Sequence, residues 1–250
     1  MIFQQRNPWQ LFIKTAPVTS VNIALVTVMF LITLVTGGFT NANLFRLGGL
    51  FAPSVVENNE WWRLFSVMYL HGSFMHYFFN TLFGLVIISA ALERIIGPVK
   101  FGIIYFVSGV GASLITVATQ YLNNSFILGV GASGAIYGVL GSFLWLTYAR
   151  PEWFGPTDIQ NIRGLILINI VFTFLVPNIS VSAHLGGLAS GVALTLLLAP
   201  TRLNRGGRQG FMNPYENSYD PFGDDPFQRL EEVEYVEDED DPDDPWGRYS

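Results

Sequence analysis

The sequence predicts an all-α membrane protein: a bundle of six transmembrane helices with both termini in the cytoplasm and a first loop in the membrane interface. Half of the 250 residues are hydrophobic and only 13% are charged, whereas about a quarter of a soluble domain is charged. The mean hydropathy is +0.39. Residues 200–250 hold 14 of the 19 acidic side chains, so residues 1–199 are more apolar than the average suggests.

Four uncharged stretches give room for six helices, each of which needs about 20 mainly apolar residues to cross the hydrocarbon core. The first helix is expected at roughly Val18–Thr36, and the second begins near Tyr69. The uncharged run Phe101–Ala149 is too long for one crossing, and the polar segment Gln120–Ser125 divides it into a third and a fourth helix.

A proline divides the last uncharged stretch, Gly164–Thr201, into a fifth and a sixth helix at Pro177-Asn178, because proline lacks an N–H donor and disfavours helix in the residue before it. Six helices place both termini on one side of the membrane. Lys and Arg are enriched in cytoplasmic loops. With the N-terminus inside, Arg46 and Arg63 lie outside, and nine basic residues lie inside: Arg6, Lys14, Arg94, Lys100, Arg150, Arg163, Arg202, Arg205 and Arg208.

This organisation predicts three regions: an N-terminal cytoplasmic segment (1–17), a transmembrane domain (18–199) and an acidic cytoplasmic tail (200–250). The tail is rich in Asp, Glu, Pro and Gly. Because such a composition cannot bury an apolar core, we expect the tail to be disordered. A solvated tail is the default interpretation, and a partner-binding segment is the alternative.

The first outer loop runs from Gly38 to about Ser66 and combines aromatic residues, among them Trp61 and Trp62, with few charges. Such a segment is expected to lie in the membrane interface, with its tryptophans at the level of the lipid headgroups. An ordinary loop with an aromatic anchor is the alternative interpretation.

The candidate nucleophile is Ser133, which stands among glycines in the segment Gly131–Gly138 of an uncharged run. All three histidines of the chain, His71, His76 and His184, lie in or beside apolar stretches. A single histidine there is most simply a hydrogen-bonded packing residue, but ionisable groups in membrane spans are costly and indicate function. Three histidines together with a serine favour a catalytic site.

Ser133, His76 and His184 are expected at one depth in the membrane. They precede the charged residue at the cytoplasmic end of their helices by 17, 17 and 18 residues, which is about 25–27 Å at about 1.5 Å per residue. Asn80 follows His76 by four residues and shares its helix face. Three helices therefore bring a serine, two histidines and an amide into one layer.

These side chains suit acyl transfer, with Ser133 as the nucleophile and His184 as the base that takes its proton. The Ser133 N–H, together with the side chains of His76 and Asn80, would stabilise an oxyanion. No carboxylate is expected at this depth, so the catalytic unit is a Ser–His dyad, and Tyr137, one turn after Ser133, would hold the imidazole by stacking. The absence of cysteine excludes thiol catalysis and Cys-based metal sites. No metal, cofactor or nucleic-acid partner is expected.

Two G-x-x-x-G pairs, Gly134/Gly138 and Gly187/Gly191, have the spacing that lets membrane helices approach closely. Each pair alone is a weak signal, but together they lie on the two helices that must touch if the serine is to reach its base. Gly131 would loosen the backbone before the nucleophile.

Three motifs resemble the signature set of bacterial-type, six-helix rhomboid intramembrane serine proteases: His71-x4-His76-x3-Asn80, Gly131-Ala132-Ser133-Gly134 with Tyr137, and Ala183-His184-Leu185-Gly186-Gly187 with Gly191. Trp62-Arg63 resembles the family's Trp-Arg motif, and Glu93-Arg94 its acidic residue at the foot of the second helix. The resemblance covers roughly residues 18–199.

The resemblance implies a multi-pass protein of the bacterial cytoplasmic membrane that cleaves transmembrane protein substrates in or near their membrane segments. It implies Ser133 as nucleophile, His184 as base, and His76 and Asn80 as oxyanion donors. By the same resemblance Tyr137 would support His184, and the fifth helix would act as a lateral gate. Four further positions match the family pattern, three of them structural (Trp62, Arg63 and Glu93) and one without a defined role (His71).

Three alternatives to an intramembrane protease agree less well with the sequence. A transporter with a histidine proton relay needs polar groups through the whole membrane, but the inner segments Leu82–Ala91 and Gly191–Leu198 are nearly all apolar. A non-proteolytic rhomboid-like binder of membrane proteins is disfavoured by the intact Ser–His pair. A soluble hydrolase with a G-x-S-x-G elbow is disfavoured because the last position is Ala135.

Overall fold

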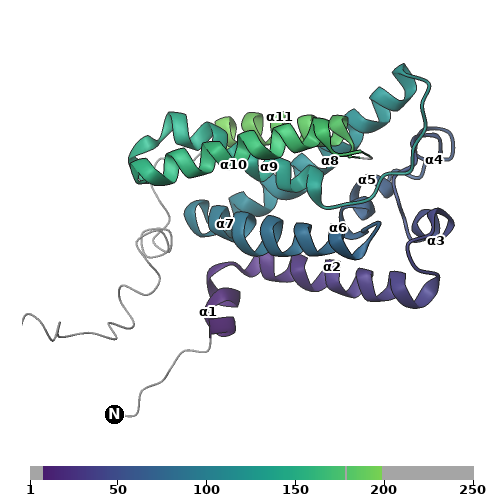
Figure 1. The fold of residues 1–250 in the computed structure, drawn as a ribbon, viewed down its shortest axis with the longest axis horizontal. Coiled ribbons are helices and arrows are strands. Elements are labelled where there is room, and N and C mark those ends of the chain that lie inside the picture. Colours follow the sequence, from purple (N-terminus) through teal and green to yellow (C-terminus); the bar gives the residue numbers. More distant parts are fainter. Residues whose placement is uncertain (1–7, 178, 199–250) are drawn as a thin grey trace, which may run out of the picture. The chain divides into compact units, whose positions relative to one another are not determined.

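The computed structural model describes residues 8–177 and 179–198, and these residues fold into helices joined by short loops (Figure 1). The helices are α1 (Pro8–Thr15), α2 (Pro17–Thr36), α3 (Asn41–Arg46), α4 (Ala52–Val56), α5 (Arg63–Ser66), η1 (Val67–Tyr69), α6 (Phe74–Phe79), η2 (Asn80–Ser89), α7 (Ala90–Ile96), α8 (Pro98–Leu122), α9 (Ser133–Ala149), η3 (Pro151–Trp153), α10 (Pro156–Leu175) and α11 (Val181–Leu198). Within the described ranges, β-structure is limited to an isolated bridge between Leu50 and Gly129.

The prediction of an all-α membrane bundle is confirmed. Five helices are long and apolar enough to cross a membrane: α2, the continuous helix Phe74–Ile96 formed by α6, η2 and α7, then α8, α10 and α11. The fourth predicted crossing, α9, is not among these five: it has 17 residues, fewer than the about 20 that a full crossing takes. The acidic tail lies outside the described residues, as does Asn178 of the predicted loop after α10.

The second crossing begins later than the sequence analysis predicted. Tyr69 lies in a 3-10 turn, Leu70 is extended, and α6 starts at Phe74 with Ser73 as its N-cap. The Ser73 side chain accepts a hydrogen bond from the backbone N–H of His76 at 3.1 Å, the usual role of a capping serine. The apolar residues before this cap fill the protein core instead of extending the helix, and Leu70 is fully buried.

Residues Asn80–Ser89 of this crossing are wound as a π-helix, which the sequence analysis did not predict. The side chain of Asn80 donates to the backbone carbonyl of His76, one turn earlier, at 2.9 Å. π-Helical turns are rare in proteins, and those that occur are often found at functional sites. Here the wide turn begins beside the candidate catalytic residues.

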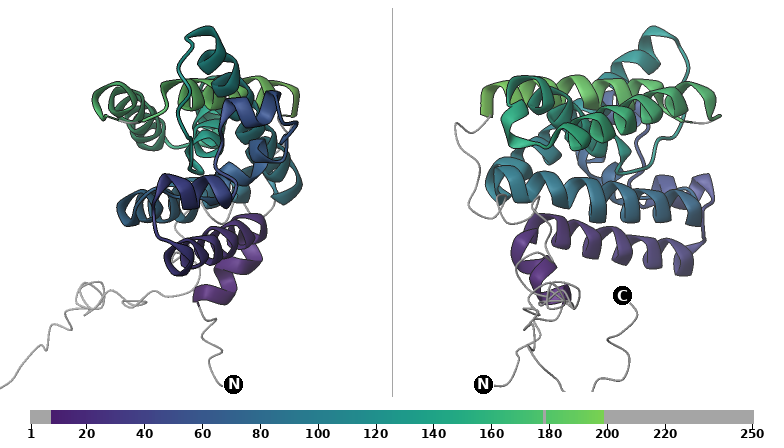
Figure 2. Two further views of the ribbon diagram at one scale, coloured as in Figure 1. Left: turned by 90° about the vertical axis from the view of Figure 1, so that its right-hand side faces the viewer. Right: turned by 60° about the vertical axis from the view of Figure 1, so that its left-hand side comes forward.

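Helix α9 occupies the centre of the bundle, where it packs against α8, α11 and η2. Figures 1 and 2 show α2 on one side of this centre and α10 and α11 on the other. Twelve of the 17 residues of α9 are buried, whereas α10 buries only Ile166 and Thr173. Among the helices of 17 or more residues, the serine candidate therefore begins the most enclosed one, and α10 is the least buried.

The first outer loop has its own structure, in which a buried arginine at the start of α5 joins that helix to α3 and to the segment after it. Arg63 is 3% exposed, and its guanidinium donates to the carbonyl oxygens of Phe45 at 2.7 Å and Gly49 at 2.9 Å. It also pairs with Glu60, and the Trp62 ring lies 4.7 Å from the guanidinium carbon. These contacts fit the structural role expected of Trp62 and Arg63.

Glu93 is fully buried and caps the start of α2. Its two carboxylate oxygens accept hydrogen bonds from the backbone N–H groups of Val18 and Thr19, each at 2.8 Å. The first N–H groups of a helix have no partner within the helix, and a negative charge there is favourable. Glu93 thereby joins the second crossing to the first.

Candidate active site

Ser133 is the first residue of α9 and follows a non-helical segment that ends at Gly131, with Ala132 as the N-cap. Gly131 has a φ of 135°, in the region that favours glycine, and its N–H donates to the Val67 carbonyl at 3.0 Å. This hydrogen bond holds the segment before α9 against η1. The first N–H groups of α9, that of Ser133 among them, have no acceptor within the helix.

His76 lies directly against this segment. A methyl group added to Gly131 would stand 2.8 Å from His76 Nε2 and 3.5 Å from Ser133 Oγ, so only glycine fits between the histidine and the serine. The Gly72 N–H points at His76 Nδ1 over 3.4 Å. Because Nδ1 accepts, Nε2 carries the proton, and it is this N–H that lies beside the nucleophile candidate.

Asn80 is buried one turn after His76 on the same helix. One hydrogen of its amide is engaged by the His76 carbonyl, at 2.9 Å. The amide carries two hydrogens, so a second one remains for an oxyanion. The hydrogen bond to the His76 carbonyl therefore positions the Asn80 side chain next to His76.

His184 lies in the first turn of α11 and is 7% exposed. Its ring stacks on Tyr137, with ring centroids 3.9 Å apart and an interplanar angle of 18°. His184 Nδ1 lies 2.9 Å from the hydroxyl oxygen of Thr173. The Tyr137 hydroxyl donates to the Asn169 carbonyl at 2.6 Å and lies 2.6 Å from Thr173 Oγ1.

Small residues let α9 and α11 touch backbone to backbone. A methyl group at Gly187 would overlap the carbonyl of Gly134, and one at Gly191 would overlap the carbonyl of Gly138. A methyl group at Gly134 would lie 3.7 Å from the Ala183 carbonyl oxygen. The direct neighbours of Ser133 and of His184 are therefore in contact.

The structure places the candidates for nucleophile, base and oxyanion donors, Ser133, His184, His76 and Asn80, at or near the first turns of α9, α11 and α6, but one expected hydrogen bond is missing. Among the hydrogen bonds of residues 8–177 and 179–198, none joins Ser133 to His184. Catalytic hydrogen bonds are often long before substrate binds and tighten only in the complex.

His71 is buried next to His76, at 1% exposure. Its ring meets His76 edge-on at 5.1 Å and Tyr77 edge-on at 5.7 Å between centroids. Burial, together with the charge of His76, lowers the pKa of His71 to about 3, so the ring is neutral at ordinary pH. It packs against His76 and Tyr77 in the protein interior.

Thr173 and Asn169 of α10 are the site residues that the sequence analysis missed. Their only signal was a spacing of four residues, which puts two polar groups on one face of an apolar helix. Two polar residues barely change the mean hydropathy of an apolar helix, and nothing in their spacing links them to His184.

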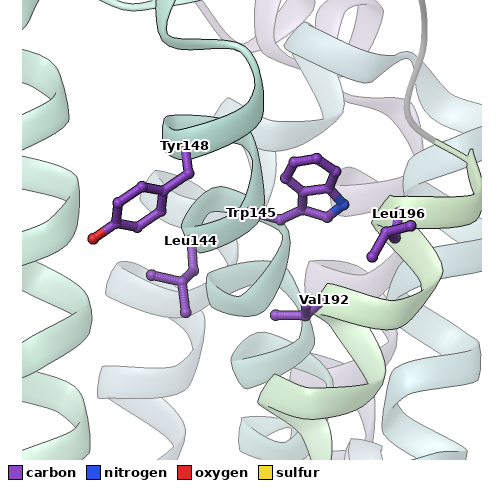
Figure 3. Close-up of a pocket in the computed structure, with 5 residues that line it drawn as sticks. All are labelled: Leu144, Trp145, Tyr148, Val192 and Leu196. Atoms are coloured by element: carbon purple, nitrogen blue, oxygen red, sulfur yellow. The ribbon is translucent and has the colours of Figure 1, made fainter.

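An open apolar pocket of about 390 Å³ lies elsewhere, beside the later turns of α9 and α11 (Figure 3). Its lining contains none of the predicted site residues and consists of Leu144, Trp145, Tyr148, Val192 and Leu196. Within the described residues, no group of three or more His, Asp or Glu side chains is placed to hold a metal ion.

Comparison with known proteins points to one family. Residues 58–201 match the family model of the Rhomboid domain. The chain is 37% identical over 170 residues to Rhomboid protease GluP of Bacillus subtilis, a match that covers 68% of this chain and 32% of that protein. It is 31% identical over 212 residues to Putative rhomboid protease YdcA of the same species, covering 82% of this chain and all of that protein.

A plant relative is equally similar: RHOMBOID-like protein 5 of Arabidopsis thaliana is 35% identical over 177 residues, which covers 68% of this chain and 52% of that protein. The chain thus spans about a third of the length of the first of these relatives, the whole of the second and about half of the third.

Proposed function

This chain belongs to the rhomboid family, and we propose that it is an intramembrane serine endopeptidase that uses Ser133 and His184 as a catalytic dyad. The family contains named proteases, and the helices of this chain make it an integral, multi-pass membrane protein. The proposed substrates are transmembrane proteins, cut in or near their membrane segments, and the proposed location is a bacterial cytoplasmic membrane.

The observation that supports this proposal most strongly is the stack of His184 on Tyr137 beside the start of α9. The stack fixes the plane of the imidazole, and the contact of Nδ1 with Thr173 fixes its rotation. A histidine that served only to fill space between helices would need neither a free ring nitrogen nor a serine hydroxyl nearby. A dyad without a carboxylate needs another means of orienting the base, and these contacts supply one.

The proposed reaction begins when His184 Nε2 takes the proton of Ser133 and the serine oxygen attacks the scissile carbonyl. The Ser133 N–H, His76 Nε2–H and Asn80 amide then stabilise the oxyanion, each donor typically contributing about a hundredfold or more to the rate. Collapse of the tetrahedral intermediate breaks the C–N bond, and His184 gives its proton to the departing amine. Water, activated by the same histidine, releases the acyl group from Ser133.

Helix α10 is the proposed lateral gate, because it buries only two residues against the rest of the bundle. A substrate helix that displaced α10 would reach the start of α9 from the lipid.

Reconstitution into liposomes tests the proposal. The full-length protein is incubated with a single-span reporter protein, and the cut is mapped by mass spectrometry. We expect a cut in or near the transmembrane segment. The competing function, a non-proteolytic binder of membrane proteins, predicts that reporters are retained intact, and an intact panel of varied reporters would favour it.

A further inference from the structure

The hydroxyl of Thr173 contacts the side of His184 that the dyad chemistry leaves unused. Thr173 Oγ1 lies 2.9 Å from His184 Nδ1, and the two side chains are 2% and 7% exposed. Polar groups this deeply buried are almost always hydrogen-bonded. Which atom donates the hydrogen decides whether His184 can act as a base, because only the Nδ1–H tautomer leaves Nε2 free to accept a proton.

The neighbouring groups decide the direction of this hydrogen bond. Thr173 carries a single hydroxyl hydrogen, and Oγ1 lies 2.9 Å from the Asn169 carbonyl, which can only accept. When Thr173 donates to that carbonyl, its lone pairs are left for the Nδ1–H of His184. The Tyr137 hydroxyl donates to the same carbonyl at 2.6 Å, and its oxygen lies 2.6 Å from Thr173 Oγ1. The Thr173 hydrogen therefore goes to one of these two oxygens, and not to His184 Nδ1.

We propose that Thr173 is a positioning residue that accepts the hydrogen bond of His184 Nδ1–H and so holds the base with Nε2 free. The inference rests on the proposed proteolytic function, since it assigns the orientation of that reaction's base. In serine proteases with a triad, a carboxylate fixes the tautomer and orientation of the histidine. Here a neutral hydroxyl, held in place by its own helix, does so.

Thr173 also makes the orientation of the base depend on the packing of α10. Only Ile166 and Thr173 of the 20 residues of α10 are buried. A second polar contact holds the first half of α10 against α9: Arg163 donates to the Thr147 carbonyl at 2.9 Å and lies over the Tyr148 ring at 3.8 Å. When α10 moves away from α9 and α11, His184 loses its Nδ1 partner. The base is therefore oriented only while α10 is in place.

Kinetics of full-length variants in liposomes provide the first test. Thr173→Val keeps the shape of the side chain and removes the acceptor, so kcat falls by about tenfold to a hundredfold with KM unchanged. Thr173→Ser restores the hydroxyl and most of kcat. The matched control is Thr119→Val on α8, since the Thr119 hydroxyl bonds only to backbone carbonyls of its own helix; this variant keeps the wild-type kcat.

The tautomer of His184 provides a second test that does not depend on activity. The chain has three histidines, so labelling with ¹⁵N-histidine gives three imidazoles, and the signals of His184 are identified by their loss in His184→Ala. We expect wild-type His184 to be protonated at Nδ1, and Thr173→Val to give a mixture of the two tautomers.

These outcomes separate the inference from the proposed function. Wild-type His184 protonated at Nε2, or a Thr173→Val variant with unchanged kcat and tautomer, overturns the role of Thr173. A wild-type protein that cleaves no reporter but shows the Nδ1–H tautomer, lost in Thr173→Val, overturns the proteolytic function alone.

Discussion

The phenol ring of Tyr137 stacks on the imidazole of His184, with ring centroids 3.9 Å apart and planes inclined by 18°. The same tyrosine donates its hydroxyl hydrogen toward α10, at the Asn169 carbonyl. Tyr137 therefore has two separable functions, since its ring supports the histidine and its hydroxyl binds the outer helix.

Substitutions at Tyr137 should separate these two functions. Tyr137→Phe keeps the stack and leaves the Thr173 contact in place, so kcat should fall by less than about tenfold. Tyr137→Ala removes a buried ring and its stacking, and kcat should fall at least about tenfold further. Both are measured on a transmembrane reporter in liposomes. Equal losses in the two variants would mean that the ring does not support His184.

The contact of α9 with α11 should be intolerant of a single methyl group. Gly191→Ala would overlap the Gly138 carbonyl, so the helices must separate, and overpacking of this kind costs about 1–3 kcal/mol. We expect a lower midpoint of thermal unfolding in detergent and a loss of cleavage. Gly164→Ala on α10 is the matched control, because a methyl group there meets nothing within 4 Å. A Gly191→Ala variant as stable as this control would contradict the close packing.

The cap of α2 should depend on the charge of Glu93. Glu93→Gln keeps the shape of the side chain but replaces one carboxylate oxygen with an NH₂ group, which cannot accept a hydrogen bond from a backbone N–H. One buried N–H donor is then unpaired, at a cost of about 1–3 kcal/mol in the free energy of unfolding. Thermal unfolding should show the loss. Glu57 is exposed and bonds to the Tyr121 hydroxyl, so Glu57→Gln should leave the unfolding midpoint nearly unchanged. Equal midpoints for the two variants would show that Glu93 does not cap α2.

His71 should make the stability of the folded protein depend on pH in the acid range. Its pKa falls to about 3 because of burial and the neighbouring His76, whereas a histidine in an unfolded chain has a pKa of about 6.5. Between these values the unfolded chain binds a proton that the folded protein does not, so the free energy of unfolding decreases as the pH falls from about 6.5 toward 3. In His71→Phe this component is absent. The difference in stability between the two proteins should therefore change across this range; a constant difference would contradict the prediction.

The sequence predicted the elements whose boundaries are marked by local chemistry. The start of α9 at Ser133 follows two glycines, Gly129 and Gly131, and the ends of α8 and α10 coincide with polar or proline-containing segments. The contact of α9 with α11 was predicted from the spacing of the glycines, because a small residue at every fourth position has a geometric meaning on a helix.

Other features depend on packing that no local pattern records. The second crossing begins at Phe74 and not near Tyr69, since Met68 and Leu70 are buried in the core and hydropathy does not distinguish a core residue from a lipid-facing one. The contact of Thr173 with His184 joins two helices across a loop, 11 residues apart in the chain. A threonine in an apolar helix gives no sign of such a partner.

The central claim is that Ser133 is the nucleophile, and cleavage by Ser133→Ala is its most direct test. The variant and the wild type are reconstituted at equal amounts with a transmembrane reporter, and the cut product is quantified. Ser125, exposed in the loop before α9, provides the control variant Ser125→Ala. We expect the Ser133→Ala protein to insert normally and to produce no cut product, while Ser125→Ala cleaves as the wild type does. Cleavage by Ser133→Ala at the wild-type position would contradict the dyad.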